Sequence, residues 1–143
     1  MPTRGRAGPE LLVDTSVAVA LTVADHRGHL TTFAAVGDRR LGLAGHAAFE
    51  TFSVLTRLPA PARRTPATVA RLLAANFPET RFLSEAGAAA LLAGLKASGI
   101  AGGAIYDALV GAAAAEHRLP LATRDRRALD TYRVLDVDVE LLT

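Results

Sequence analysis

The sequence predicts an α/β fold, with a single domain built on a central, mostly parallel sheet of about five short strands flanked by helices. Three observations lead to this prediction. Short apolar runs alternate with longer helical segments, which is the order expected when helices connect the strands of a parallel sheet. The length of 143 residues suits one hydrophobic core. No repeat, linker or low-complexity tract divides the chain.

The first half of the chain contains two expected strands and four expected helices. The apolar run at residues 11–13 ends in Asp14-Thr15-Ser16, residue types that cap the start of a helix. Pro59 and Pro61 end one helix, and Pro66 opens the next at a position where its missing N–H costs nothing. The expected strands are residues 11–13 and 41–44, and the expected helices are residues 17–23, 29–36, 46–58 and 66–76.

The second half continues this alternation. Ser84 is expected to cap an alanine-rich helix that Gly99 ends, and Gly102-Gly103 precedes a long helix. The expected strands are residues 81–83, 119–123 and 132–135, and the expected helices are residues 85–97, 104–117 and 126–131.

Composition narrows the class of protein. Cysteine is absent, which excludes disulfides, thiolate metal sites and cysteine nucleophiles. Apolar residues make up 50% of the chain, yet no apolar run approaches the roughly 20 residues of a membrane helix. Residues 1–9, which include Arg4 and Arg6, are expected to form an N-terminal tail, and residues 10–143 are expected to form the domain. The apolar run that follows the tail is too short for a secretory signal. We therefore expect a soluble cytoplasmic protein.

The charge balance is only a weak indication that the protein binds nucleic acid. Sixteen basic residues face 14 acidic ones, a net charge of +2, and all but one of the basic residues are arginine. Arginine stays charged and binds phosphate through two parallel hydrogen bonds, as a nucleic-acid-binding protein requires. Genomic base composition explains an arginine-rich, alanine-rich chain equally well.

Two aspartates follow expected strands directly. Asp14 ends the first strand, and Asp125 follows residues 119–123. Because reactive groups of a parallel sheet gather beyond the carboxyl ends of its strands, both carboxylates are expected to face one crevice. Taken singly, each could instead be only a helix N-cap.

Two further acids interrupt apolar helices. Asp107 shares a helical stripe with Ala104, Val110 and Ala114, and burying a carboxylate there is costly unless a cation, a donor or the helix N-terminus meets it. Glu50 is the only acid of its helix, although a glutamate that simply reaches solvent would look the same.

If these four carboxylates converge, their mutual repulsion favours a cation between them. Oxygen ligands indicate Mg²⁺ or Mn²⁺ rather than zinc. Such an ion polarises a phosphoryl group and activates a water, so the arrangement points to phosphodiester hydrolysis.

The ordered motifs resemble the PIN-domain nucleases, and most closely the VapC-type toxins of bacterial toxin–antitoxin pairs. The likeness covers about residues 12–134, and each motif is weak alone but fairly specific as an ordered set. The motifs are Val13-Asp14-Thr15-Ser16-Val17, the Phe-Glu-Thr-Phe-Ser-Val-Leu run around Glu50, Tyr106-Asp107-Ala108-Leu109 and Leu121-Ala122-Thr123-Arg124-Asp125.

The resemblance implies a Mg²⁺- or Mn²⁺-dependent endoribonuclease. Its catalytic acids would be Asp14, Glu50, Asp107 and Asp125. Asp14 and Asp107 would hold the metal, and the other two would bind it directly or through water. Thr15, Ser16 and Thr123 match polar positions whose hydroxyls would order these carboxylates or metal-bound water.

The resemblance also implies partners. A small VapB-like antitoxin would lay its C-terminal segment in a groove between helices and block the acids, and the toxin would form a homodimer. Candidates for that groove are the face of Phe49, Phe52 and Leu55 and the helix at residues 68–75. These apolar residues could equally be core.

The remaining charged and aromatic residues are less informative. Arg124, Arg126 and Arg127 bracket Asp125 and would meet an RNA phosphate, or they form an ordinary surface turn. His26 and His29 lack a third metal ligand, and His46 and His117 are expected to be caps or surface residues. Tyr106 and Tyr132 are too few to form a base-stacking platform.

Two non-nuclease alternatives remain open. In a receiver-like regulatory domain, Asp14 or another strand-end acid would accept a phosphoryl group, but the only lysine, Lys96, falls within an expected helix. In a PIN-like module without catalysis, the acids would be present but lack the geometry to act, and the domain would only bind RNA or protein.

Overall fold

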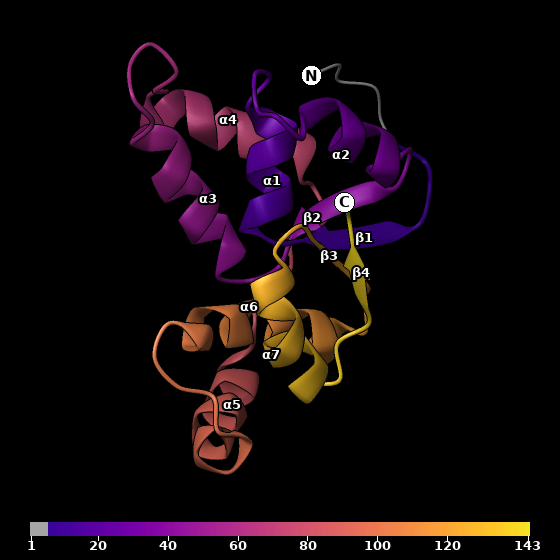
Figure 1. Ribbon diagram of the computed structural model, residues 1–143, viewed down its shortest axis with the longest axis vertical. Coiled ribbons are helices and arrows are strands. Elements are labelled where there is room, and N and C mark those ends of the chain that lie inside the picture. Colours follow the sequence, from indigo (N-terminus) through magenta and orange to yellow (C-terminus); the bar gives the residue numbers. More distant parts are fainter. Residues whose placement is uncertain (1–5) are drawn as a thin grey trace.

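Four short parallel strands form the sheet at the centre of the computed structural model, which describes residues 6–143 (Figure 1). The strands are β1 (Glu10–Val13), β2 (Arg40–Leu43), β3 (Leu121–Thr123) and β4 (Val139–Leu141), in the order β2-β1-β3-β4. In the central pairs, Leu12 lies opposite Leu121 and Val13 lies opposite both Ala122 and Leu43. The predicted α/β fold with a parallel sheet is confirmed, with four strands where about five were expected.

Helices cover both faces of this sheet. Their bounds are α1 (Thr15–Thr22), α2 (His29–Val36), α3 (Ala47–Thr56), α4 (Pro66–Asn76), α5 (Glu85–Ser98), α6 (Ala104–His117), the 3₁₀ turn η1 (Arg126–Ala128) and α7 (Leu129–Val134). The expected N-caps Thr65 and Ser84 accept backbone hydrogen bonds at the starts of α4 and α5.

The alternation of side chains along β1 creates two separate cores. Leu11 and Val13 pack on one face with α1, α2 and Phe77, while Leu12 packs on the other face with α6 and α7. The helix after β1 therefore lies on one face, and the helix after β3 lies on the opposite face. Since β1 and β3 are neighbours, a crevice opens between their carboxyl ends, where ligands bind in this class of sheet.

α5 differs from the other long helices. None of its 14 residues is buried, and it packs chiefly against α6 at one end of the molecule (Figure 1). Its apolar side chains include Leu92, which is largely exposed.

The prediction of a strand at residues 132–135 was wrong, because these residues belong to α7 and the turn after it. Valine and tyrosine favour strands only weakly, and here tertiary packing decides the conformation. The Tyr132 ring is fully buried against Gly111 of α6, where a Cβ would stand 3.0 Å from it. The last strand is β4, which follows α7.

The prediction of a strand at residues 81–83 was also wrong in its extent. Residues 79–81 run along the free edge of β2, where Glu79 N donates to Leu41 O and Arg81 N donates to Leu43 O, but only Arg81 forms a β-bridge, with Ala44. The backbone of Glu79 crosses so close to Gly42 that a Cβ there would lie 2.1 Å from its carbonyl oxygen. A glycine is thus required for this edge to be covered.

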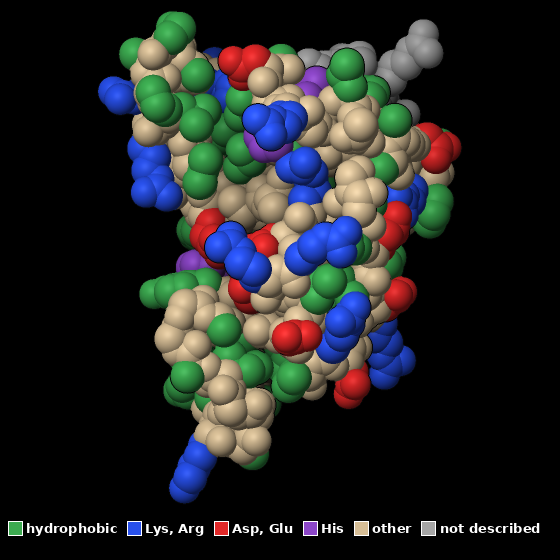
Figure 2. All heavy atoms as spheres, in the orientation of Figure 1, with side chains coloured by type: hydrophobic (Ala, Val, Ile, Leu, Met, Phe, Trp, Pro, Cys, Tyr) green, Lys and Arg blue, Asp and Glu red, His purple; other side chains and the backbone are tan. Residues whose placement is uncertain are grey.

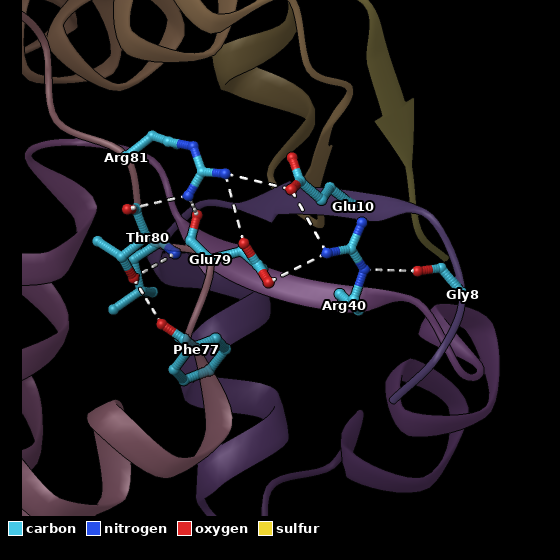
Figure 3. A network of polar contacts seen from close by, with 8 residues as sticks. Gly8, Glu10, Arg40, Phe77, Glu79, Thr80 and Arg81 are labelled. Atoms are coloured by element: carbon cyan, nitrogen blue, oxygen red, sulfur yellow. Dashed lines mark hydrogen bonds and ion pairs between the residues drawn. The ribbon is translucent and has the colours of Figure 1, made fainter. Parts of the chain in front are cut away.

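Four charged side chains hold this edge segment to the sheet (Figure 3). Arg81 contacts Glu10 and Glu79, and Arg40 contacts the same two carboxylates, with N–O distances of 3.2–3.6 Å. A covered, charged edge resists pairing with another chain, so we interpret this network as structural.

The N-terminal end of the described chain already contacts the fold. Gly8 N donates to Asp38 O, and the Arg6 guanidinium lies 5.5 Å from the Phe33 ring centroid. Residues 1–5 of the predicted tail, including Arg4, lie outside the described residues, and the domain boundary at residue 10 stays a prediction. Across residues 6–143, no helix has the length and apolar character needed to cross a lipid bilayer.

Candidate active site

Asp14 lies at the carboxyl end of β1 and is almost fully buried, with 5% of its surface exposed. Its Oδ1 accepts hydrogen bonds from Ser16 Oγ (2.5 Å) and Val17 N (3.3 Å), so it is the N-cap of α1, as the simpler interpretation proposed. Its Oδ2 accepts a hydrogen bond from the Tyr132 hydroxyl at 2.9 Å. Burial raises the pKa of Asp14, and these donors oppose that rise.

Tyr132 is the site residue that the sequence did not reveal. It comes from α7, and its hydroxyl reaches the carboxylate of Asp14 through the second core. Burial and the nearby Asp14 charge raise the pKa of Tyr132 far above its ordinary value, so the phenol stays protonated and donates. The sequence interpretation placed Tyr132 on a strand, and no local signal pairs it with a residue 118 positions away.

Asp107 and Glu50 come from the first turns of α6 and α3, and both line the same cavity. Burial is the largest cause that raises the pKa of Asp107, and together with the negative charges of Asp125, Asp14 and Glu50 it brings that pKa to about 6. Burial also raises the pKa of Glu50, against the effect of His46, whose Nε2 is 3.6 Å from Glu50 Oε1. Asp107 therefore senses the other three carboxylates as like charges, and Glu50 senses Asp14 in the same way.

Asp125 follows β3 and completes the group. Its backbone N donates to Thr123 Oγ1 at 3.0 Å, and its Oδ1 accepts from Arg127 N at 3.0 Å, which makes it the N-cap of η1. The hydroxyls of Ser16 and Thr123 lie 3.5 Å apart, and Ser16 Oγ also accepts from Arg124 N. The two hydroxyls thus join the ends of β1 and β3.

All four predicted acids line one cavity of about 100 Å³ at the carboxyl end of the sheet. Its lining residues are Asp14, Thr15, Ser16, Glu50, Asp107, Val110, Asp125 and Tyr132. Figure 2 shows acidic side chains gathered around a hollow of this face, with one basic side chain in front of them and another beside them. The capping roles of Asp14 and Asp125 are real, but they coexist with a shared cavity, which caps alone would not produce.

The oxygen atoms that line this cavity suit a hard divalent cation as ligands. The cavity offers carboxylate and hydroxyl oxygens, and the buried Thr15 Oγ1 has no hydrogen-bond partner in the structure. Within residues 6–143, however, no three acidic or histidine side chains stand close enough to enclose one ion as they are placed. Direct binding of one cation by three of the acids would therefore require them to draw together, whereas Mg²⁺ can also be held by one or two carboxylates with water as its other ligands.

Comparison with known proteins identifies the family. The model of the PIN domain family matches residues 11–134 of the chain. The chain belongs to the PIN domain family. It is 50% identical over 131 residues to Ribonuclease VapC27 of Mycobacterium tuberculosis, a match that covers 92% of this chain and 96% of that protein. It is 44% identical over 134 residues to Ribonuclease VapC40 of the same species, covering 91% and 97%. The resemblance to VapC-type proteins is thus confirmed.

Solved structures show the same fold at low sequence identity. VapBC2 from Rickettsia felis, crystallised with a DNA fragment from its promoter, contains a chain with a TM-score of 0.66 and 12% identity, covering 94% of this chain and 99% of that one. FitAcB from Neisseria gonorrhoeae gives a TM-score of 0.63 at 20% identity, covering 90% and 95%. The PIN fold is therefore shared where the sequence has largely diverged.

The three arginines near Asp125 occupy different surroundings in this PIN domain. Arg127 Nε lies 3.2 Å from Asp125 Oδ1, and its side chain is 93% exposed at the rim of the acids. Arg126 is also exposed. Arg124 lies over Gly28, where a Cβ would stand 2.3 Å from its Nη2, so its guanidinium packs against the loop before α2.

The histidines near that loop make backbone contacts. His26 Nδ1 accepts from Gly28 N at 2.9 Å, and His29 Nδ1 lies 2.8 Å from Ala20 O. Neither contact indicates a metal site. His117 Nε2 contacts Phe82 O, as expected of a surface residue.

The predicted groove residues separate into core and surface. Leu55 and Val69 are fully buried, as the core interpretation held, whereas Phe49 is 66% exposed. The helix at residues 68–75 does line a groove of about 350 Å³ between α1, the start of α2 and α4. Its lining residues are Leu21, Thr22, Ala24, His29, Thr68, Arg71, Leu72 and Asn76.

Proposed function

We propose that this PIN domain is a Mg²⁺- or Mn²⁺-dependent endoribonuclease and the toxin of a type II toxin–antitoxin pair. The observation that supports this most is the single cavity into which Asp14, Glu50, Asp107 and Asp125 converge from four separate elements. Its position between the carboxyl ends of β1 and β3 is the usual ligand crevice of a parallel sheet. The two Mycobacterium tuberculosis relatives are ribonucleases by name and match over almost their whole length.

The proposed mechanism divides the work between the cation and the chain. A divalent cation at the acids would polarise the scissile phosphate and lower the pKa of a water positioned for in-line attack. Tyr132 and Ser16 each donate to one oxygen of Asp14, so they fix the orientation of that carboxylate before anything binds. The exposed Arg127 and Arg126 stand beside the cavity and would meet the RNA phosphates.

Cleavage of total bacterial RNA by the purified protein tests this proposal. Discrete fragments should form with Mg²⁺ or Mn²⁺, disappear with EDTA, and be absent when Asp107→Asn is prepared identically. Activity that persists in Asp107→Asn would show that the site is assigned wrongly. Mapping the fragment ends would then define the cleavage sequence, and a metal titration would distinguish one ion from two.

The α1–α4 groove is the best place in the structure for an antitoxin segment. It lies at the C-terminal end of α1, whereas Asp14 caps the N-terminal end of the same helix. Eight helical residues span about 12 Å, so about four extended residues of a VapB-like antitoxin would reach from groove to acids. Co-expression with the antitoxin should give a stable, inactive complex, and Leu72→Asp should release active toxin.

A homodimer and a cytoplasmic location remain predictions. The exposed apolar surface of α5 is available to a second copy of the chain. Light scattering on the purified protein would give the mass directly, and a monomer at high concentration would contradict the dimer.

One observation favours the non-catalytic alternative, a PIN module that binds RNA or protein without cleaving. In the described part of the chain no three acidic or histidine side chains stand close enough to share one ion. Calorimetry with Mn²⁺ decides between the two, because a competent site should bind the ion and lose it in Asp14→Ala. The receiver-like alternative has no comparable support, since Lys96 is exposed in the last turn of α5.

A further inference from the structure

Four ring side chains adjoin one another beside the acid cavity. His46 stacks on Tyr106 with ring centroids 5.4 Å apart and an interplanar angle of 23°. The next contacts are His46 to Phe49 at 6.4 Å and Phe49 to Phe82 at 6.0 Å. The rings come from the start of α3, the segment before α5 and the start of α6, so the fold alone brings them together.

This aromatic surface contributes little to either core. Phe49 is 66% exposed, Tyr106 is 55% exposed and Phe82 is 54% exposed. They are three of the six large apolar side chains that the described chain leaves most exposed. Adjoining exposed aromatic rings are costly in water and mark a surface that binds something.

The aromatic surface is continuous with the acids. Glu50 lines the acid cavity and also a neighbouring hollow of about 310 Å³ together with His46, Phe49 and Arg57. His46 and Phe49 in turn line a third hollow, which reaches Phe82. In Figure 2, histidine and hydrophobic side chains adjoin the acidic hollow at the left edge of the face. A chain-like ligand with one phosphate at the acids would therefore extend over these rings.

We propose that His46, Phe49, Phe82 and Tyr106 form a stacking platform for bases of single-stranded RNA next to the bond held at the acids. The proposal rests on the proposed nuclease function and adds where the substrate's bases bind. Unpaired RNA bases stack on aromatic faces, whichever base is present, so such a platform holds the strand without reading its sequence. The two tyrosines alone were too few for this role, and the structure supplies the phenylalanines that complete it.

RNA fits this surface better than a second protein chain for two reasons. The hollow that contains Phe49 shares Glu50 with the acid cavity, so its occupant must also come close to the reacting phosphate. Arg57 lines the same hollow and supplies a cation where the next phosphate of a strand would lie. A purely apolar protein contact would explain neither feature.

Equilibrium binding of RNA with and without its bases tests the platform directly. The probes are a labelled single-stranded RNA 12-mer and the same ribose–phosphate chain lacking every base, measured by fluorescence anisotropy in EDTA so that no cleavage occurs. The wild-type protein should bind the intact RNA about 5-fold to 100-fold more tightly than the chain without bases. In Phe49→Leu with Phe82→Leu, which keeps apolar side chains but removes two ring faces, this ratio should fall toward one.

Controls separate a stacking role from a general effect on the fold. Leu92→Ala removes an equally exposed apolar side chain from α5 and should keep the wild-type ratio. Phe49→Trp should keep or increase it. An unchanged ratio in the double leucine variant overturns the platform. This holds also if light scattering shows that the variant no longer binds a second copy of the chain, because the aromatic surface then served that contact.

A parallel cleavage assay distinguishes this inference from the proposed function. If the wild-type protein cleaves RNA but binds intact and base-free chains equally, the platform is refuted while the nuclease stands. If the wild-type protein does not cleave but prefers the intact RNA, and the leucine variant loses that preference, the platform is supported and the nuclease proposal fails.

Discussion

Replacing Asp107 by asparagine should stabilise the metal-free protein at neutral pH. Burial and three neighbouring carboxylates raise the pKa of Asp107 from 3.8 to about 6. The folded state therefore holds the Asp107 proton more tightly than the unfolded state does. Stability is lost as the pH rises from about 4 through about 6, because ionising this group costs more in the folded protein than in the unfolded chain. Asparagine has the same shape and never ionises, so it removes that cost.

The magnitude follows from the shift. About two pKa units correspond to about 3 kcal/mol at most. Asp107 is only half-buried, and solvent screening reduces this to about 1–2 kcal/mol. For a chain of 143 residues, that corresponds to a rise in melting temperature of about 3–7 °C.

Thermal unfolding in EDTA between pH 4.5 and 7.5 measures this difference. The gain of Asp107→Asn over wild type should be about a third of its full size at pH 4.5 and should approach its full size above pH 6. Asp138→Asn, which changes an exposed acid, should show no such dependence. Added Mn²⁺ should then stabilise the wild-type protein more than the variant, because only the wild type has the full set of carboxylates.

Two results would refute this reasoning. An Asp107→Asn protein that is no more stable than wild type at pH 7.5 in EDTA would mean that Asp107 is not strained by its neighbours. A gain of equal size at every pH would mean that the effect has nothing to do with ionisation.

Three further predictions concern single contacts. Tyr132→Phe removes the donor to Asp14 Oδ2 and should weaken Mn²⁺ binding about 10-fold to 100-fold, as measured by calorimetry, while the circular dichroism spectrum stays unchanged. An unaltered affinity would mean that the hydroxyl does not orient the carboxylate. Ser84→Ala removes the N-cap of α5 and should lower the free energy of unfolding by about 1 kcal/mol in urea, and a change near zero would show that α5 does not unfold with the rest of the domain. Gly42→Ala places a Cβ 2.1 Å from the Glu79 carbonyl oxygen and should lower the free energy of unfolding by more than about 2 kcal/mol in urea. Gly94→Ala, on the open surface of α5, should be neutral or stabilising. Equal effects of the two substitutions would show that the edge segment is not held against β2.

Local patterns determined most of the elements and all four acids. Helix starts at Pro66 and Ser84 were predictable because capping and proline geometry depend on neighbours in the sequence. The acids were predictable because strand ends and apolar helix faces are visible as patterns, and the parallel order of the strands then brings strand ends to one edge. The two strand predictions were wrong where tertiary packing outweighs a weak local preference for the strand conformation, as at Tyr132.

What only the tertiary structure decided is which distant side chains meet. The sequence by itself determined an α/β chain of the PIN type and the four acids that share one cavity. The hydrogen bond from Tyr132 to Asp14, and the contacts that join His46, Phe49, Phe82 and Tyr106, link residues from separate elements. No periodicity along the chain encodes such contacts, because they depend on how helices on the two faces of the sheet are placed relative to one another. That placement is set by the summed packing of both cores.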